Sequence, residues 1–321
     1  EHAMETFDQE TVLRHAGMLA NRVRKRMSVL GKGFRKEGIE AFRLYDWDIP
    51  EVRAVVDWYA GHLVVGEYVR EQHGPDYLPA LAEAVGEALG VPPERRHLRR
   101  RRTGRPEDGP RYVPLGEGGE RIRVRERDLV FLVNLEDRLD TGLFPDHRDT
   151  RRMIRDLARD RTFLNLYAYT GTFTCAAMAG GARASWTVDR SARYLDWARE
   201  NLRENDLLGP ACHLERDDAL SFLSRAASRG LRFDLIFVDP PSFSENPEGR
   251  FEVQRDHPDL LRRVLRVALP GALVFFSTNH QRFDPRLRDL PARSVREITD
   301  RTVPRDYRNR QVHRCWRIEA M

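Results

Sequence analysis

The stretch LIFVDPPSF (235–243) places an acid, two prolines and an aromatic ring directly after four apolar residues. Proline cannot donate to a sheet ladder, so the strand must end there and a rigid loop must follow. In open α/β sheets, ligands bind at the carboxyl ends of the strands. We therefore expect Asp239, Pro240, Pro241 and Phe243 to be the catalytic residues, with a backbone carbonyl facing the substrate and a ring that can support a base. A rigid turn with a packed ring is the alternative.

Three further strand ends carry residues that suit a nucleoside. In NLYAYTGT (165–172), Gly171 stands where a strand gives way to a helix, and glycine lets the backbone approach a ligand closely. Asp189 ends the next strand, where a carboxylate can accept two hydrogen bonds from ribose hydroxyls. Asp218 heads the helix after the third strand and can accept the amino group of adenine. Each acid can instead cap its helix, although Ser191 is a better cap than Asp189.

Other chemistries have little support. The glycine turn is not G-x-G-x-x-G, and no G-x-x-x-x-G-K-[ST] occurs, which argues against a dehydrogenase or a nucleotide triphosphatase. Cys175, Cys212 and Cys315 are far apart and lack metal or redox spacing. We expect reduced thiols, no metal and a cytoplasmic protein. No apolar stretch is long enough for a membrane span, so we expect no membrane partner.

These residues must be positioned by the second half of the chain, where strands and helices alternate. The pattern predicts strands at 162–168, 184–189, 212–216, 233–239 and 271–278, and helices at 147–159, 191–206, 218–228 and 252–269. Such alternation indicates an α/β, Rossmann-like domain with a mostly parallel sheet and helices on both faces. Two closing strands near 295–302 and 313–319 predict one antiparallel strand. We place this domain at 136–321.

The first part of the chain has a different pattern. Residues 9–37 have apolar positions three and four apart and basic residues between them, which predicts one or two amphipathic helices. Residues 40–70 indicate short strands, 76–89 a helix and 121–135 one or two strands. We therefore expect a basic helical segment at 1–38 and a small α+β domain that contacts RNA at 39–135.

The charge is positive and comes almost entirely from arginine. The formal net charge is +5, and only Lys25, Lys32 and Lys36 among the 55 basic residues are lysines. Arginine suits bidentate phosphate contact, although a codon preference explains the bias equally well. The candidate phosphate contacts lie on the basic helix and before a loop, and they are Arg24, Lys25, Arg99, Arg100, Arg101 and Arg102. A solvated face and a surface loop without function are the alternatives.

In combination, the glycine turn, the two acids and Asp-Pro-Pro resemble the class I S-adenosylmethionine-dependent methyltransferases. The segments that sharpen the resemblance are LDTGLFPDHR, FLNLYAYTGT, TVDRSARYLDWARENLREN, FDLIFVDPPSFS, FEVQRDHPDLLRRVLR and RDYRNRQVHRCW. They are similar to the guanine-N7-methylating half of the bifunctional bacterial 23S ribosomal RNA methyltransferase, over nearly the whole chain except the arginine-rich 95–111. The resemblance implies a seven-stranded sheet, S-adenosylmethionine as cofactor with S-adenosylhomocysteine as product, and 23S rRNA as partner. That family usually carries an upstream guanine-N2-methylating half, so a separate or truncated half is another expected partner.

The resemblance also implies individual roles. It places at the cofactor Asn165, Tyr167, Tyr169, Thr170, Gly171, Asp189, Arg190, Asp218 and Asp239. It puts TGLFPDHR near the methionine end of the donor or near the substrate, where Arg148 suits the donor carboxylate or Asp146 its ammonium group, with a packed linker as the alternative. In STNHQRF (277–283), Asn279 suits a guanine edge and Arg282 a phosphate, with loop capping as the alternative.

The target atom decides which catalytic groups are needed. Guanine N7 has a free lone pair, so in-line methyl transfer depends on positioning and needs no general base. Guanine N2 must lose a proton, and pyrimidine C5 needs a cysteine nucleophile after strand four or at the end of strand five. Those places hold Ser242 and Thr278. We therefore expect an enzyme for guanine N7 of 23S rRNA, with guanine N2 of an RNA and a non-catalytic RNA-binding or assembly module as alternatives. The target nucleotide and the oligomeric state stay open.

Overall fold

The computed structural model describes residues 5–101, 119–137 and 141–321. Arg102, one of the candidate phosphate contacts, lies outside these ranges. The chain forms two compact units, one made of residues 1–145 with 305–309 and the other of 146–304 with 310–321. Within the described residues, no helix is both long and apolar enough to cross a membrane.

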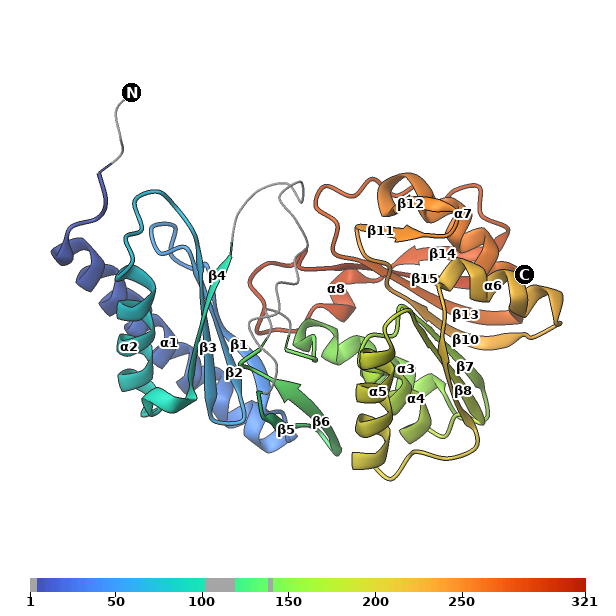
Figure 1. Ribbon diagram of the computed structural model, residues 1–321, viewed down its shortest axis with the longest axis horizontal. Helices are drawn as coiled ribbons and strands as arrows, with labels where there is room; N and C mark the ends of the chain where they lie inside the picture. The colour runs from blue at the N-terminus through green and yellow to red at the C-terminus, as the bar shows by residue number, and fades with distance from the viewer. Residues whose placement is uncertain (1–4, 102–118, 138–140) are drawn as a thin grey trace. The chain divides into compact units, whose positions relative to one another are not determined.

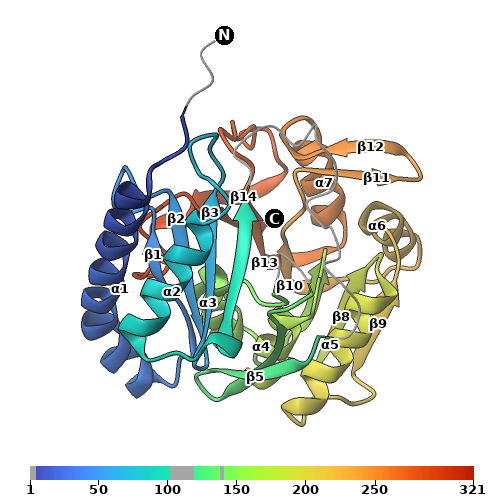
Figure 2. The same cartoon turned by 60° about the vertical axis from the view of Figure 1, so that its left-hand side comes forward.

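In the first unit, two helices cover one face of a four-stranded sheet (Figures 1 and 2). The strands β1 (Ala41–Asp46), β2 (Ala54–Tyr59), β3 (His62–Tyr68) and β4 (Arg96–Arg101) lie in that order, and β4 runs parallel to β3. The helices are α1 (Gln9–Glu37) and α2 (Tyr77–Leu89), followed by the 3-10 turn η1 (Pro93–Arg95). A separate hairpin pairs β5 (Arg121–Glu126) with β6 (Leu129–Asn134).

The long amphipathic pattern forms a single helix. The carboxylate of Asp8 accepts a hydrogen bond from Thr11 N, and Gly38 ends the helix in the left-handed conformation. Leu19, Val23 and Phe34 are buried against the sheet, whereas the opposite face is exposed. Burial of this continuous apolar face explains why the helix does not break.

The arginine-rich segment is partly a strand, which we did not predict. Residues 96–101 form β4, paired with β3, so successive side chains point to opposite faces. Arg99 is buried and its guanidinium donates to the carbonyl of Leu135, whereas Arg100 is exposed. Arg99 therefore does not face solvent whereas Arg100 does, and the phosphate contacts of both stay predictions.

A short segment from late in the sequence completes the first unit. The backbone N–H of Arg43 donates to Asp306 Oδ2 at 2.9 Å, and Arg26 donates to the Asp306 carbonyl at 3.0 Å. Asn309 N donates to Asp46 Oδ2 at 2.7 Å. Residues 305–309 therefore supply acceptors to Arg43 of the small sheet and Arg26 of α1 and a donor to Asp46, which no sequence pattern indicated.

The second unit contains the predicted seven-stranded sheet, in the order β14-β15-β13-β10-β7-β8-β9. The strands are β7 (Thr162–Leu166), β8 (Ala184–Asp189), β9 (Cys212–Arg216), β10 (Phe233–Val238), β13 (Ala268–Thr278), β14 (Ala292–Glu297) and β15 (Arg314–Ala320). β15 runs antiparallel to both of its neighbours, β13 and β14, and is the one strand of this sheet that runs opposite to the others, as expected. The first closing strand ends earlier than we predicted, because 299–302 form the short helix α8 (Thr299–Thr302).

Helices cover both faces of this sheet, as Figure 1 shows. Leu235 and Phe237 of β10 pack on one face with α3 (Arg148–Leu157) and α4 (Thr172–Ala179). The alternate residues of β10 pack on the other face with α6 (Ala219–Ser228) and α7 (Val253–Arg266). Residues 235–238 of this strand are all apolar because both faces of the sheet are buried there.

Candidate active site

The order of the strands reverses between β7 and β10, since β8 and β9 lie to one side and β13 to the other. In open α/β sheets the ligand site lies outside the carboxyl ends of the strands at such a switch point. The turn 167–171, Asp189, Asp218 and the loop that starts at Asp239 all follow carboxyl ends of these parallel strands. The sheet therefore gathers the predicted cofactor residues and the predicted catalytic loop at one edge.

Asp189 is held in place by the backbone around it. Its Oδ2 accepts a hydrogen bond from Tyr169 N and its Oδ1 one from Ser191 N, each at 2.9 Å. Ser191 Oγ itself caps α5 (Ala192–Glu204), so Asp189 is not the helix cap. Burial raises the pKa of Asp189, and the two backbone donors counteract part of that rise. Each carboxylate oxygen can accept a second hydrogen bond, so the group keeps acceptor capacity for a pair of hydroxyls.

The turn after β7 is strained and tightly packed. Tyr167 and Tyr169 both have φ of 53°, and Gly171 has φ of 72°. A β-carbon on Gly171 would lie 2.6 Å from the β-carbon of Ala198, so glycine is required here by helix packing as well as by conformation. Left-handed tyrosines are uncommon, and such strain concentrates at ligand sites.

Two of the predicted cofactor residues lie inside the core. Asn165 and Thr170 are fully buried. The amide of Asn165 donates to Thr174 Oγ1 at 3.0 Å, and the carbonyl of Thr170 accepts from Asn201 at 2.9 Å. These contacts hold the backbone of the turn in place. Because both side chains are buried, these residues act on a ligand only indirectly, by fixing that backbone.

The third strand end separates two neighbouring acids. Asp217 binds the guanidinium of Arg225, whereas Asp218 Oδ2 caps α6 through Ser221 N at 3.1 Å. No partner of Asp218 Oδ1 occurs among the residues that the structure describes. Asp218 therefore caps its helix and still offers one oxygen, as the adenine contact requires. Arg190, beside Asp189, is exposed.

The Asp239 loop continues into a hairpin that we did not predict, formed by β11 (Phe243–Asn246) and β12 (Gly249–Glu252). Phe243 is half-buried, and the guanidinium of Arg250 lies 5.0 Å from the centre of its ring. On another side, its ring meets His280 edge to face at 5.9 Å. The side chain of Asp239 is 30% exposed.

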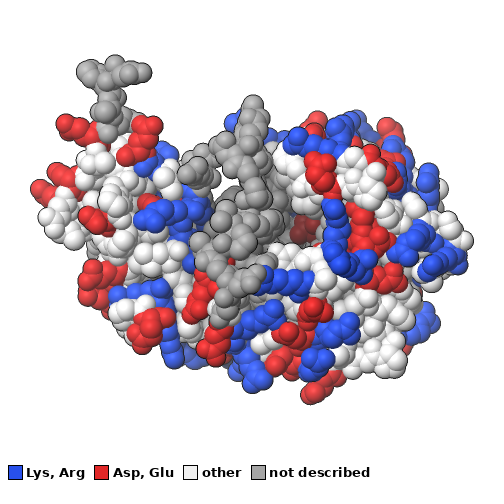
Figure 3. Space-filling model, in the orientation of Figure 1, with Lys and Arg blue, Asp and Glu red and all other residues white. Residues whose placement is uncertain are grey.

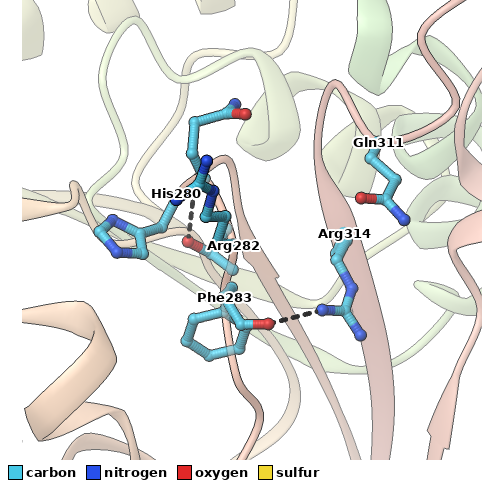
Figure 4. A pocket seen from close by; sticks show the side chains of 7 residues that line it. His280, Arg282, Phe283, Gln311 and Arg314 are labelled. Atoms are coloured by element: carbon cyan, nitrogen blue, oxygen red, sulfur yellow. Dashed lines mark hydrogen bonds between the residues drawn. The ribbon is translucent and has the colours of Figure 1, made fainter. Parts of the chain in front are cut away.

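A pocket of about 260 Å³ lies at the end of β13 next to this loop. Figure 4 shows His280, Arg282 and Phe283 on one side of it and Gln311 and Arg314 on the other. Arg314 donates to the carbonyl of Phe283 at 2.8 Å and pairs with Glu297. Arg282 is exposed with φ of 56°, and none of the described residues forms an ion pair with it.

The other predicted residues near the site are placed differently. Asn279 is exposed but does not line this pocket. Arg148 is 2% exposed, and Asp146 Oδ2 lies 2.8 Å from His313 Nδ1. Arg148 is thus buried and Asp146 is engaged by His313, which fits the packed-linker interpretation, and their contacts with the donor stay predictions.

The remaining candidate cations lie on the first unit. Arg24 and Lys25 are exposed on α1, whereas Arg22 and Arg26 of the same helix pair with Asp48 and with the Asp306 carbonyl. On the face drawn in Figure 3, basic and acidic side chains are interspersed on both units. An RNA contact there would therefore depend on individual arginines more than on one continuous basic surface.

A mostly parallel seven-stranded sheet with one antiparallel strand, and acids at its carboxyl edge, defines a Rossmann-like methyltransferase. Residues 45–300 match the S-adenosylmethionine-dependent methyltransferase family, and the chain belongs to that family. S-adenosylmethionine is therefore its methyl donor, and the predicted fold class and cofactor are confirmed.

Solved structures show the same fold. The methyltransferase SMU.776, solved in complex with S-adenosylhomocysteine, has a TM-score of 0.75 and 20% identity, covering 96% of this chain and 82% of that one. A SAM-dependent methyltransferase from Streptococcus mutans has a TM-score of 0.74 and 20% identity, covering 95% and 81%. One from Agrobacterium tumefaciens has a TM-score of 0.61 and 18% identity, covering 88% and 91%.

The residues at the sheet edge fit this donor. Asp189 suits the ribose hydroxyls and Asp218 Oδ1 the adenine amino group, while the strained turn brings backbone close to the same edge. When bound, the donor supplies an electrophilic methyl group on a sulfonium. The chain must hold it and orient a nucleophile in line with the methyl carbon.

Proposed function

We propose that this enzyme methylates guanine N7 in 23S ribosomal RNA. The observation that carries the proposal is the Asp239-Pro-Pro-Ser-Phe243 loop at the switch point, next to the donor-binding acids. Its half-buried ring suits a base that is splayed out of the RNA and stacked, and the neighbouring pocket adds polar and cationic groups. The resemblance of the sequence to the guanine-N7-methylating family supplies the atom and the RNA.

Transfer to N7 makes few chemical demands on these residues. The N7 lone pair is free, so the protein needs only to position the base and exclude water. The buried cysteines fit this view, because burial raises the pKa of Cys175 and Cys315 and keeps them protonated. A thiolate route to pyrimidine C5 is therefore disfavoured for both.

Guanine N2 is the second candidate, and the partly exposed carboxylate of Asp239 favours it, since this group can accept the amino hydrogens. The two candidates differ in their product. Purified protein should be incubated with unmodified 23S RNA and labelled donor, and the RNA then cleaved by borohydride and aniline. Cleavage at one guanine supports N7, whereas label retained without cleavage, and a digest whose mass spectrum shows N2-methylguanosine, supports N2.

We further propose that residues 39–135 contact the RNA, with 1–38 as a basic helical segment and 136–321 as the catalytic domain. A separate guanine-N2-methylating half and a cytoplasmic location belong to the same proposal. The exposed cations of α1 and β4 support an RNA-contacting role for the amino-terminal residues.

Arg100 provides a direct test of RNA contact by β4. Its side chain is 58% exposed and pairs with Glu67, so it can reach a phosphate without unfolding the sheet. We expect Arg100→Ser to reduce the slope of log Kd for RNA against log salt by about one. The measurement is fluorescence anisotropy at several salt concentrations.

Arg293 offers a matched control for Arg100. It is 64% exposed on the edge strand β14 and pairs with Glu319. Arg293→Ser should leave the salt slope unchanged. Equal slopes for Arg100→Ser and wild type would show that β4 does not touch the RNA.

Arg282 tests the pocket. Its left-handed backbone is tolerated by asparagine, so Arg282→Asn removes the cation and spares the turn. We expect KM for RNA to rise about threefold to tenfold with donor affinity unchanged, as loss of one phosphate contact predicts. Arg288→Asn, at an exposed position on the same connection but outside the pocket, is the control. An unaltered KM for Arg282→Asn would remove this pocket from the RNA path.

A further inference from the structure

Two stacked histidines lie beside the Asp239 loop, and neither was among the candidate residues. The rings of His147 and His313 are 4.1 Å apart and inclined by 15°. Both residues are buried, at 4% and 1% exposure. Burial of an imidazole is unfavourable unless its ring nitrogens find partners. Those partners therefore indicate what the pair does.

His313 is fixed by contacts at both of its ring nitrogens. Its Nδ1 lies 2.8 Å from Asp146 Oδ2, and its Nε2 lies 3.0 Å from Thr302 Oγ1. Burial lowers the pKa of His313, which keeps the ring neutral, although Asp146 counteracts part of this effect. With both nitrogens engaged, the ring forms a rigid support for the ring stacked on it.

His147 is fixed as well, and it meets the catalytic loop. Its Nδ1 lies 3.2 Å from Thr150 Oγ1, and its Nε2 lies 3.4 Å from Ser277 Oγ and 3.5 Å from Asp239 Oδ2. Two phenylalanines, Phe173 and Phe237, meet the edge of the ring at 5.7 Å each. If Thr150 donates to Nδ1, the ring proton is on Nε2 and points at the Ser277 and Asp239 oxygens.

Asp239 has few other restraints. Among the residues that the structure describes, His147 is the one ionisable group that pairs with this carboxylate. A short acid at the start of a loop has several rotamers, and an error of about 1 Å in a catalytic group can cost about a hundredfold in rate.

We propose that His147 is a positioning residue that fixes the carboxylate of Asp239 toward the substrate, and that His313 and Asp146 hold His147 in turn. The proposal rests on the proposed function, because it takes Asp239 to be part of the substrate site. A distance of 3.5 Å is long for a hydrogen bond, and contacts of this kind shorten when the substrate is bound.

A divalent cation is the competing occupant of the cluster. Asp146, His147 and His313 each bring one ligand atom within 4.8 Å of the others. However, every ring nitrogen already has a protein partner, and a cation would have to displace them. The observed contacts therefore favour a hydrogen-bonded support, and metal content becomes an outcome of the test.

Two substitutions of His147 distinguish the contribution of the stacked ring from that of its N–H donor. His147→Phe keeps the stacking and loses the donor, whereas His147→Gln loses the ring and can place an amide N–H near the former Nε2. We expect His147→Phe to lower kcat on RNA about tenfold to a hundredfold, with S-adenosylhomocysteine affinity and RNA KM within about twofold. His147→Gln should retain kcat within about threefold of wild type.

His257→Phe is the matched control, because His257 is buried in the same unit and bonded to Val253 O and Arg286 N. It should lower thermal stability and leave kcat within about twofold. An unchanged kcat for His147→Phe, or a His147→Gln variant as slow as His147→Phe, would overturn the proposal. So would a stoichiometric divalent metal in the purified protein.

A readout without turnover distinguishes this proposal from the proposed function. The ring nitrogens of His147 can be assigned by NMR from the signals lost in His147→Phe. Asp239→Asn should then shift the Nε2 signal of His147, and an unshifted signal would contradict the contact. If wild type modifies no guanine while this shift is present, the proposed function fails and the contact stands.

Discussion

Asp189→Ala should weaken S-adenosylhomocysteine binding about a hundredfold in calorimetry. The carboxylate offers two acceptors for ribose hydroxyls, and hydrogen bonds to a charged group contribute about 1.5–3 kcal/mol each. The substitution also removes the acceptor of the Tyr169 and Ser191 N–H groups. The turn after β7 should therefore become less ordered, which weakens binding further. We therefore expect a larger effect than for any other single acid at the sheet edge.

Asp217→Asn is the control for Asp189. Asp217 lies at the end of the next strand, where its carboxylate pairs with Arg225 and accepts a hydrogen bond from the backbone N–H of Asp218. Its charge is therefore engaged within the protein. Its substitution should leave donor affinity within about twofold. Donor affinity that survives Asp189→Ala would refute the ribose role, and wild type without donor affinity would revive the non-catalytic alternative.

The pH dependence of donor affinity follows from the same carboxylate. Burial raises the pKa of Asp189, so it takes up a proton at a higher pH than an ordinary aspartate. On acidification, the donor affinity of wild type should therefore begin to decline at a higher pH than an aspartate with an ordinary pKa would cause. The donor affinity of Asp189→Asn should not change over the same pH range. Because the folded-state pKa is raised, protonation of Asp189 favours the folded state, and circular dichroism at each pH separates the decline in affinity from unfolding caused by other groups.

Phe243→Ala should lower turnover about tenfold to a hundredfold and leave donor affinity within about twofold. Stacking of a base on an aromatic side chain contributes about 1–3 kcal/mol. The ring also packs against His280 and Arg250, so some of the loss would come from disorder of the hairpin. Single-turnover rates with labelled donor measure the effect.

The variants Phe243→Leu and Phe243→Tyr distinguish stacking of a base on the ring from simple filling of space by the side chain. Leucine fills the space without an aromatic face and should be nearly as slow as alanine, whereas tyrosine should retain most of the activity. Full activity of the leucine variant would show that the residue only packs the hairpin. Equal losses in turnover and in donor affinity would place Phe243 at the donor.

Much of the second unit could be predicted from sequence because its signals are local. Short segments of five or six residues between helical patterns predicted β8 and β9 with the bounds that the structure has. Asp189 was found because it ends the first of these strands, and Asp218 because it begins the helix after the second. The family was then predicted from the resemblance of whole motifs, because no single residue is specific enough to identify it.

The missed features depend on distant parts of the chain. Arg96–Arg101 carries little β-forming character, and only pairing with β3 makes it a strand and buries Arg99. His147 and His313 are 166 positions apart, so no local pattern joins them. The burial of Asn165 and Arg148 likewise follows from helices that pack over the sheet. A motif can mark a residue, but it does not show which way the side chain points.

Residues 305–309 come late in the sequence but belong to the first unit, which has a consequence for biosynthesis. Asp306 binds Arg43 across 263 positions, and Arg305 and Tyr307 lie over Phe34 and Arg43. Domains generally fold as they leave the ribosome, amino-terminal ones first. Until residues 305–309 are translated, the backbone N–H of Arg43 in the small sheet lacks the Asp306 carboxylate that accepts its hydrogen bond. Splitting the gene between the two units would therefore yield an amino-terminal fragment that remains incomplete unless the five-residue peptide is supplied with it.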